Sequence, residues 1–121
     1  MSMLLSFMKI EKFEDIQARQ NARVLTQHIY IIFWESKDRW FKDQICRAAV
    51  SIGNNIAEWF ERKSNNELKQ FLYIAKWSSS EVRSMLYIAQ DLWYITDLQF
   101  TSLIELSTII AKQLSNFIKT L

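Results

Sequence analysis

Hydrophobic residues recur every three or four positions along this chain of 121 residues, in four blocks that polar segments separate. This spacing places the hydrophobic side chains of each block on one face of an α-helix. The four faces consist of Ala18, Ala22, Leu25, Ile29 and Ile32; of Phe41, Ile45, Ala48, Ile52, Ile56 and Phe60; of Leu68, Phe71, Ala75, Ser79, Val82, Leu86, Ala89 and Trp93; and of Leu103, Leu106, Ile110, Leu114, Phe117 and Leu121. Short intervening segments favour antiparallel neighbours. The pattern therefore predicts an all-α protein, an antiparallel up-down-up-down four-helix bundle.

Polar residues at the block edges indicate where helices begin. Asp38 is suited to cap a helix that starts near Arg39, because its carboxylate can accept an otherwise unpaired backbone N–H. Two further pairs fit the capping-box pattern, Ser64 with Glu67 and Thr96 with Gln99. We assign residues 13–121 to one bundle domain and residues 1–12 to an N-terminal extension, for which flexibility is expected.

The composition supports a helical protein and offers little catalytic chemistry. Proline is absent and glycine occurs once, whereas sheet proteins use both at their turns. The chain has one cysteine, Cys46, and one histidine, His28, so a metal site built from several such ligands is not expected. No nucleophile–histidine–carboxylate set and no glycine-rich phosphate loop is recognisable. We expect a protein that is not an enzyme and that needs no metal or other cofactor.

The apolar N-terminus, residues 1–8, is too short to span a bilayer and has no basic segment typical of a signal peptide. Charged residues interrupt the later apolar segments. We therefore expect a cytoplasmic protein with no membrane partner, in which the single thiol is a small buried hydrophobic group.

Positive charge is concentrated in the middle of the chain. The net charge is +2, and residues 39–83 hold eight basic and five acidic residues. A basic face on the second and third helices could contact nucleic-acid phosphates, or could simply be solvated. The candidate contact residues are Arg39, Lys42, Arg47, Arg62, Lys63 and Lys69.

The apolar faces of the third and fourth helices are wider than one bundle core requires. The additional residues are Tyr73, Ile74, Tyr87, Ile88, Ile104, Ala111 and Ile118. Surplus apolar surface of this kind favours a second interface. We predict that the chain forms a homo-oligomer.

Several segments resemble one known family. Residues 44–58, QICRAAVSIGNNIAE, resemble its central signature, and residues 71–81 resemble its FLxIAxGSxxE motif. Residues 92–94 resemble its LGY motif, and residues 13–16 its opening FxDL. On these motifs the chain resembles the four-helix-bundle proteins encoded within 23S ribosomal RNA intervening sequences.

The resemblance implies an up-down bundle. Relatives in the family form homopentamers, so it also implies a homo-oligomer. More distant relatives are accessory proteins of diversity-generating retroelements, in which a basic pentamer binds nucleic acid. The polar positions that match the family motifs are Asn55, Glu58, Ser78 and Glu81. A hydrogen-bonded seam that fixes helix register is the favoured interpretation of these four residues, and a ligand or metal site the alternative.

Four tryptophans depart from the family pattern. Relatives have glycine at the positions of Trp40, Trp59, Trp77 and Trp93, while this chain has a single glycine, Gly53, where the family has proline. Replacing glycine by tryptophan at tight helix contacts would overpack them. We hypothesise that these four codons are UGA, read as glycine in the source and rendered here as tryptophan. The alternative is that the residues are true tryptophans in a repacked bundle.

The sequence as a whole predicts a non-enzymatic, oligomeric bundle that binds RNA or DNA through basic residues of its second and third helices. The alternative is a protein–protein interaction scaffold that docks a partner on its aromatic surface.

Overall fold

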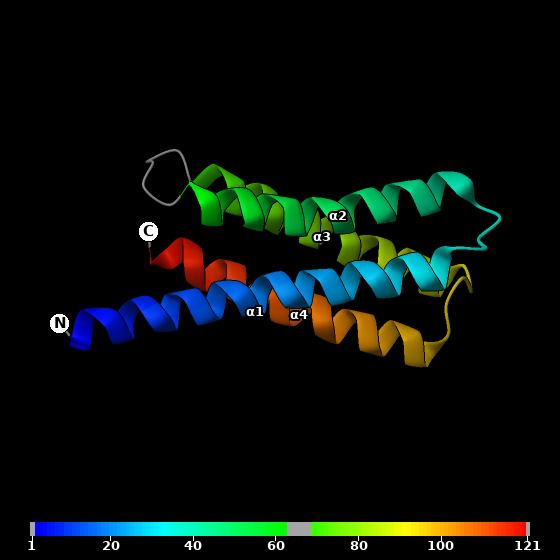
Figure 1. Cartoon of the computed structure of the whole chain (residues 1–121). Coiled ribbons are helices and arrows are strands. Elements are labelled where there is room, and N and C mark those ends of the chain that lie inside the picture. The colour runs from blue at the N-terminus through cyan, green and yellow to red at the C-terminus, as the bar shows by residue number, and fades with distance from the viewer. Residues whose placement is uncertain (1, 63–68, 121) are drawn as a thin grey trace.

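Four helices make up the computed structural model, which describes residues 2–62 and 69–120, with side chains from residue 17 onward. They are α1 (Ser2–Phe33), α2 (Arg39–Glu61), α3 (Lys69–Asp91) and α4 (Asp97–Lys119). Consecutive helices run in opposite directions, and each packs against two neighbours, α1 on α2, α2 on α3, α3 on α4 and α4 on α1 (Figure 1). The antiparallel up-down-up-down bundle is confirmed.

Helix α1 is longer than the hydrophobic stripe that predicts it. It has 32 residues, against 23 for each of the others, which at ~1.5 Å per residue are about 35 Å long. Its N-terminal part extends beyond the end of the bundle in Figure 1. Residues 2–12 include Met, Leu, Lys and Glu, which favour the helical conformation.

The core is a continuous apolar seam along the bundle axis. Leu25, Ile52, Leu86 and Ile110, one from each helix, are fully buried. Burying a side chain of this size is worth about 1.5–3 kcal/mol, so the repeated stripe is the main source of stability. Cys46 lies at the edge of this core, and burial raises the pKa of its thiol.

The predicted stripe of the third helix is buried from Ala75 to Ala89 and differs from the prediction at its two ends. Leu72, rather than Phe71, is fully buried, and Phe71 packs only partly against the core. The prediction was also wrong for Trp93, which lies after the end of α3 and is 89% exposed. The C-terminal turn of α3 ends the stripe at Ala89, because the chain must leave the helix axis to reach α4.

Two predicted helix starts are confirmed. The Asp38 carboxylate accepts the backbone N–H of Phe41 at 3.0 Å at the start of α2. At the start of α4, Thr96 Oγ1 accepts the N–H of Gln99 at 3.1 Å, and Gln99 Oε1 accepts the N–H of Thr96 at 2.9 Å. The proposed Ser64–Glu67 capping box lies outside the described residues.

Asp38 also ties together the two turns at one end of the bundle. Tyr94 Oη, from the turn between α3 and α4, donates to Asp38 Oδ2 at 2.7 Å. The ring of Tyr94 packs edge-on against Phe41, with centroids 5.3 Å apart. The Phe41 N–H and the Tyr94 hydroxyl lower the pKa of Asp38, because both stabilise its charged form, and the same contact raises the pKa of Tyr94.

The backbone at Trp93 has a conformation that favours glycine. Its φ is 61°, and Trp93 is the only residue with positive φ among those described. The N–H of Tyr94 donates to the carbonyl of Ala89 at 2.8 Å, and that of Trp93 to Gln90 at 3.1 Å. These are the two bonds of a Schellman motif, with Trp93 at the left-handed position that glycine usually occupies.

The other tryptophans divide into exposed and buried cases. Trp40 and Trp77 are 70% and 65% exposed, and the expectation of overpacking is wrong for them and for Trp93, because all three face solvent. Trp59 is 6% exposed and stacks on Phe117 of α4 at 5.1 Å between centroids, so the core accommodates it. Backbone strain at Trp93 and indole exposure at Trp40, Trp77 and Trp93 are what support the glycine hypothesis.

We expect Trp93→Gly to raise the free energy of unfolding by about 1 kcal/mol relative to Trp93→Ala. The reason is that the left-handed backbone conformation costs an L-residue roughly 1–2 kcal/mol, and glycine avoids this cost. Trp93→Ala is the matched control, because it removes the indole but keeps the strain. Urea unfolding of both variants measures the difference. Equal stabilities would show that the positive φ carries no cost.

Sequencing the gene tests the glycine hypothesis directly. We expect UGA at codons 40, 59, 77 and 93, and an intact mass of the native protein that fits glycine at these positions. UGG at these codons would refute the hypothesis.

Removing the Tyr94 hydroxyl should raise the pKa of Asp38. Because the folded-state pKa is depressed, the ionised carboxylate stabilises the fold above the unfolded pKa of about 4, and this contribution is lost as the pH falls through the folded pKa. In Tyr94→Phe we expect Asp38 to titrate at higher pH than in the wild type, so its ionisation contributes less stability and this smaller contribution is lost over a narrower pH range below the unfolded pKa. Carboxyl-carbon NMR measures this pKa, with Tyr73→Phe as the control; unchanged titration in Tyr94→Phe would contradict the analysis.

Candidate nucleic-acid interface

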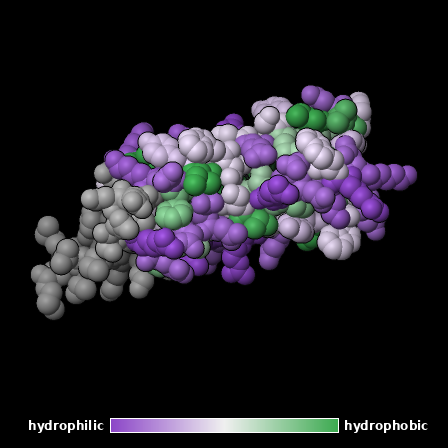
Figure 2. Space-filling view, turned by 90° about the horizontal axis from the view of Figure 1, so that it is seen from above, coloured by the Kyte–Doolittle hydropathy of each residue, from purple (hydrophilic) through white to green (hydrophobic). Residues whose placement is uncertain are grey.

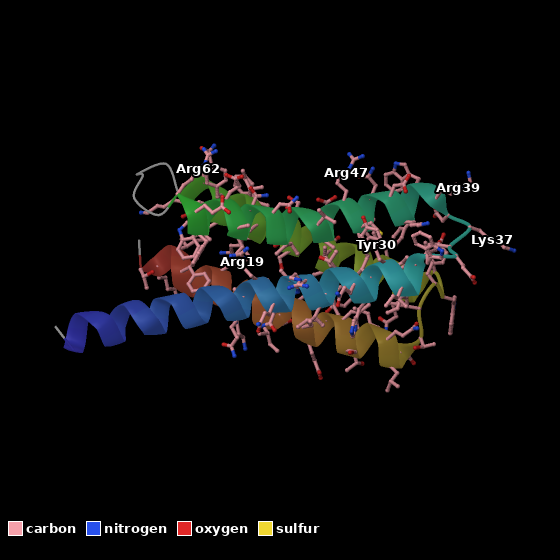
Figure 3. All side chains as sticks on the ribbon, in the orientation of Figure 1. Arg19, Tyr30, Lys37, Arg39, Arg47 and Arg62 are labelled. Atoms are coloured by element: carbon pink, nitrogen blue, oxygen red, sulfur yellow. The ribbon has the colours of Figure 1, made fainter. Side chains whose placement is uncertain are left out.

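Three of the predicted contact residues form a row on α2. Arg39, Arg47 and Arg62 are exposed, and Figure 3 shows them pointing away from the bundle on the same side of α2. They are eight and fifteen residues apart, or about 12 and 22 Å along the axis at ~1.5 Å per residue. The row therefore extends over most of the length of α2.

The other three predicted residues are less available. Lys42 Nζ donates to the carbonyl of Trp34 at 3.0 Å and lies 4.5 Å from the centroid of its ring, so this lysine closes the end of α1. Lys69, the first residue of α3, is exposed. Lys63 lies outside the described residues.

Acidic residues reduce the positive charge of the α2 row. Between residues 39 and 62, α2 carries four basic side chains against Asp43, Glu58 and Glu61, a net charge of +1. Arg62 Nε lies 3.1 Å from Glu58 Oε2, with both side chains largely exposed. An exposed pair of this kind contributes about 0–1 kcal/mol, so Arg62 can exchange its partner for a phosphate at little cost.

Only half of the predicted polar seam is brought together. Ser78 Oγ on α3 donates to Ser51 Oγ on α2 at 2.9 Å, and Asn55 Nδ2 donates to the Ser51 carbonyl at 2.8 Å and to its hydroxyl at 3.2 Å. Ser51 is the bridging residue that the sequence analysis missed, although it lies one helical turn before Asn55. Glu58 pairs with Arg62 and does not join this network.

Glu81 is exposed on α3 and also lies apart from the network. Within the described part of the chain, no group of three or more His, Cys, Asp or Glu side chains is arranged to hold a metal ion. The contacts observed in the seam are those that join Asn55 to Ser51 on α2, and Ser51 to Ser78 of α3.

Two clefts on the surface carry basic residues that the sequence analysis did not select. One, of about 350 Å³, lies between α1 and α2 and includes Arg19 and Arg23; Figure 3 shows Arg19 between these helices. The other, of about 460 Å³, lies between α3 and α4 and includes Lys112 and Lys119 of α4. The sequence contained a sign of the second cleft, because Lys112 and Lys119 are one heptad apart, as Lys76 and Arg83 are on α3.

The outer surface is mixed in character. In the space-filling view from above, hydrophilic residues cover much of the face and hydrophobic residues form separate patches (Figure 2). Several large hydrophobic side chains remain exposed, among them Tyr73, Tyr87 and Ile88 of α3 and Ile109 of α4. None of the described helices is long and apolar enough to cross a membrane.

Comparison with solved structures identifies a similar bundle in Bacteroides thetaiotaomicron, a protein of unknown function from the S23 ribosomal protein family. The two chains share 25% sequence identity and superpose with a TM-score of 0.78, over 88% of this chain and 98% of the other. A comparison with curated proteins gives no match.

Comparison with protein families gives a match over residues 14–116 to the family described as 23S rRNA-intervening sequence protein. This range includes all of α2 and α3 and most of α4, together with every motif on which the resemblance rests except its first residue, Phe13. The chain belongs to the 23S rRNA-intervening sequence protein family.

Proposed function

We propose that this protein is a non-enzymatic, cytoplasmic homo-oligomer that binds nucleic acid, with RNA as the preferred ligand. The observation that carries the proposal is the exposed row of Arg39, Arg47 and Arg62 on α2. Arginine can donate two parallel hydrogen bonds to a phosphate, and such contacts give affinity with little sequence preference. Ribosomal RNA fragments are the first probe, because the family takes its description from 23S rRNA.

Self-association would strengthen a weak electrostatic surface. A single chain carries a net charge of only +2, and each further copy in an assembly adds the same charge. An assembly of this kind could bury the exposed apolar residues of α3 and α4 in its interfaces. A ring of copies, the pentamer of the family resemblance, would repeat the α2 row around its circumference.

A protein-binding scaffold is the second candidate. Tyr73 and Trp77 lie one turn apart on α3, their ring centroids are 6.3 Å apart, and both side chains are exposed. Aromatic residues of this kind are enriched at protein interfaces. Binding that is insensitive to salt and lost on replacement of Tyr73 would favour this function over the first.

Fluorescence anisotropy of labelled single-stranded ribosomal RNA fragments, measured over a salt series, tests the nucleic-acid proposal. We expect affinity to fall steeply with salt, and Arg47→Gln to reduce the magnitude of the log–log slope by about 0.7, the value for one lost phosphate contact to a single strand.

The matched control is Arg23→Gln, which removes the same charge from an exposed position on α1. We expect it to leave the slope unchanged. Equal effects of the two substitutions would show that only net charge matters, and no binding at low salt would overturn the proposal for these RNAs.

A further inference from the structure

The groove between α3 and α4 has an unusual set of side chains. Its volume is about 460 Å³, and nine residues line it: Lys76, Ser80, Arg83, Thr108, Ala111, Lys112, Ser115, Asn116 and Lys119. Four are cationic, four carry hydroxyl or amide groups, and one is alanine. No carboxylate is among them, in contrast to α2, where acidic residues interrupt the basic row.

No described side chain pairs with the four cations of the groove. The side chains of Lys76, Arg83, Lys112 and Lys119 make no hydrogen bond and no ion pair with another described residue. The Nε of Arg83 is buried and lacks a hydrogen-bond partner within the described part of the chain. Buried donors in proteins are nearly always paired, so this Nε is a donor that a ligand at the groove could satisfy.

The positions of the cations suit an extended anion. Lys76 and Arg83 are seven residues apart on α3, as Lys112 and Lys119 are on α4, so each pair spans about 10 Å at ~1.5 Å per residue. Because α3 and α4 are antiparallel neighbours, the two pairs form the two sides of one groove. Ser80, Ser115 and Asn116 add polar side chains along it, and Ala111 is its one apolar lining residue.

We propose that this groove holds the phosphodiester backbone of a single-stranded nucleic acid. Packed helices are about 8–10 Å apart, so a groove between two of them admits one strand rather than a duplex. Tyr73 is 40% exposed and lies one turn before Lys76 on α3, and an exposed aromatic ring can stack on a base. The choice of nucleic acid as the ligand rests on the proposed function. The residues that line the groove differ from those of the α2 row, and none of them is one of the four tryptophans at glycine positions of the family.

The cleft between α1 and α2 is the weaker of the two basic clefts. It contains two arginines, and Arg19 already lies 5.4 Å from the centroid of the Phe60 ring. The groove between α3 and α4 has twice as many cations, and none of them is placed over an aromatic ring.

The test compares two double variants that remove the same charge. Lys76→Gln/Lys112→Gln removes one cation from each side of the groove, and Arg39→Gln/Arg47→Gln removes two of the three arginines of the α2 row. Anisotropy of a labelled 20-nucleotide RNA, with a DNA strand of the same sequence, is measured over a salt series. We expect the groove variant to lose at least tenfold in affinity at low salt, and about 1.4 in the log–log slope, the value for two lost single-strand contacts.

A second measurement uses tripolyphosphate as the probe and does not depend on RNA binding. In ¹⁵N-arginine-labelled protein, we expect the Hε signal of Arg83 to shift on addition of tripolyphosphate, and that of Arg23, an exposed arginine of α1, to remain in place. A shift of Arg83 without RNA binding would mean that the groove takes small polyphosphates, and would overturn the nucleic-acid assignment.

The remaining outcomes separate the two proposals. An unchanged affinity in the groove variant, with loss in the α2 variant, overturns the groove and supports the α2 row. Loss in the groove variant alone supports the groove and overturns the α2 row. Circular dichroism of both variants checks that the helices are intact. If Lys76→Gln/Lys112→Gln unfolds the protein, the test is repeated with Lys112→Gln/Lys119→Gln, at two exposed positions of α4.

Discussion

The burial of four apolar stripes in one seam is the constraint on which the rest of this structure depends. Each helix contributes fully buried side chains, such as Leu25, Ile52, Leu86 and Ile110, and no stripe can be buried unless all four helices pack together. This packing fixes the rotation of each helix about its own axis. It therefore also fixes which basic residues face outward and which helices form a groove between them.

The distribution of charge over the outer faces is uneven as a consequence. On α2 the basic residues share the surface with acidic ones, and Arg62 is already paired with Glu58. Between α3 and α4, the four cations converge from two helices without any carboxylate lining the groove. A phosphate that enters this groove would displace no internal ion pair, whereas one that binds at Arg62 would compete with a neighbouring carboxylate.

Much of the fold was predictable because it follows from residues close together in the sequence. The hydrophobic period, the Asp38 cap and the Thr96–Gln99 capping box all depend on short separations, and the structure confirms them. The stripe of α3 was misplaced by one residue at Phe71, since neighbouring apolar residues leave the rotation of the helix open until it packs.

The candidate sites were less predictable because they combine residues from different helices. Ser51 bonds to Ser78, 27 positions away in the sequence, as well as to Asn55, and that bridge depends on the register of α2 against α3. Likewise, Lys112 becomes a neighbour of Lys76 only once α3 and α4 are paired. The strain at Trp93 is also a property of the turn, which periodicity does not describe.

Photocrosslinking of RNA containing 4-thiouridine, followed by mass spectrometry of the crosslinked peptides, tests the central claim most directly, because it locates the nucleic acid on the bundle. We expect crosslinks in the segments around Tyr73 and along residues 108–119, with further crosslinks on α2 between Arg39 and Arg62. Crosslinks confined to α1, or none under conditions in which RNA binds, would show that neither the groove nor the α2 row holds the RNA.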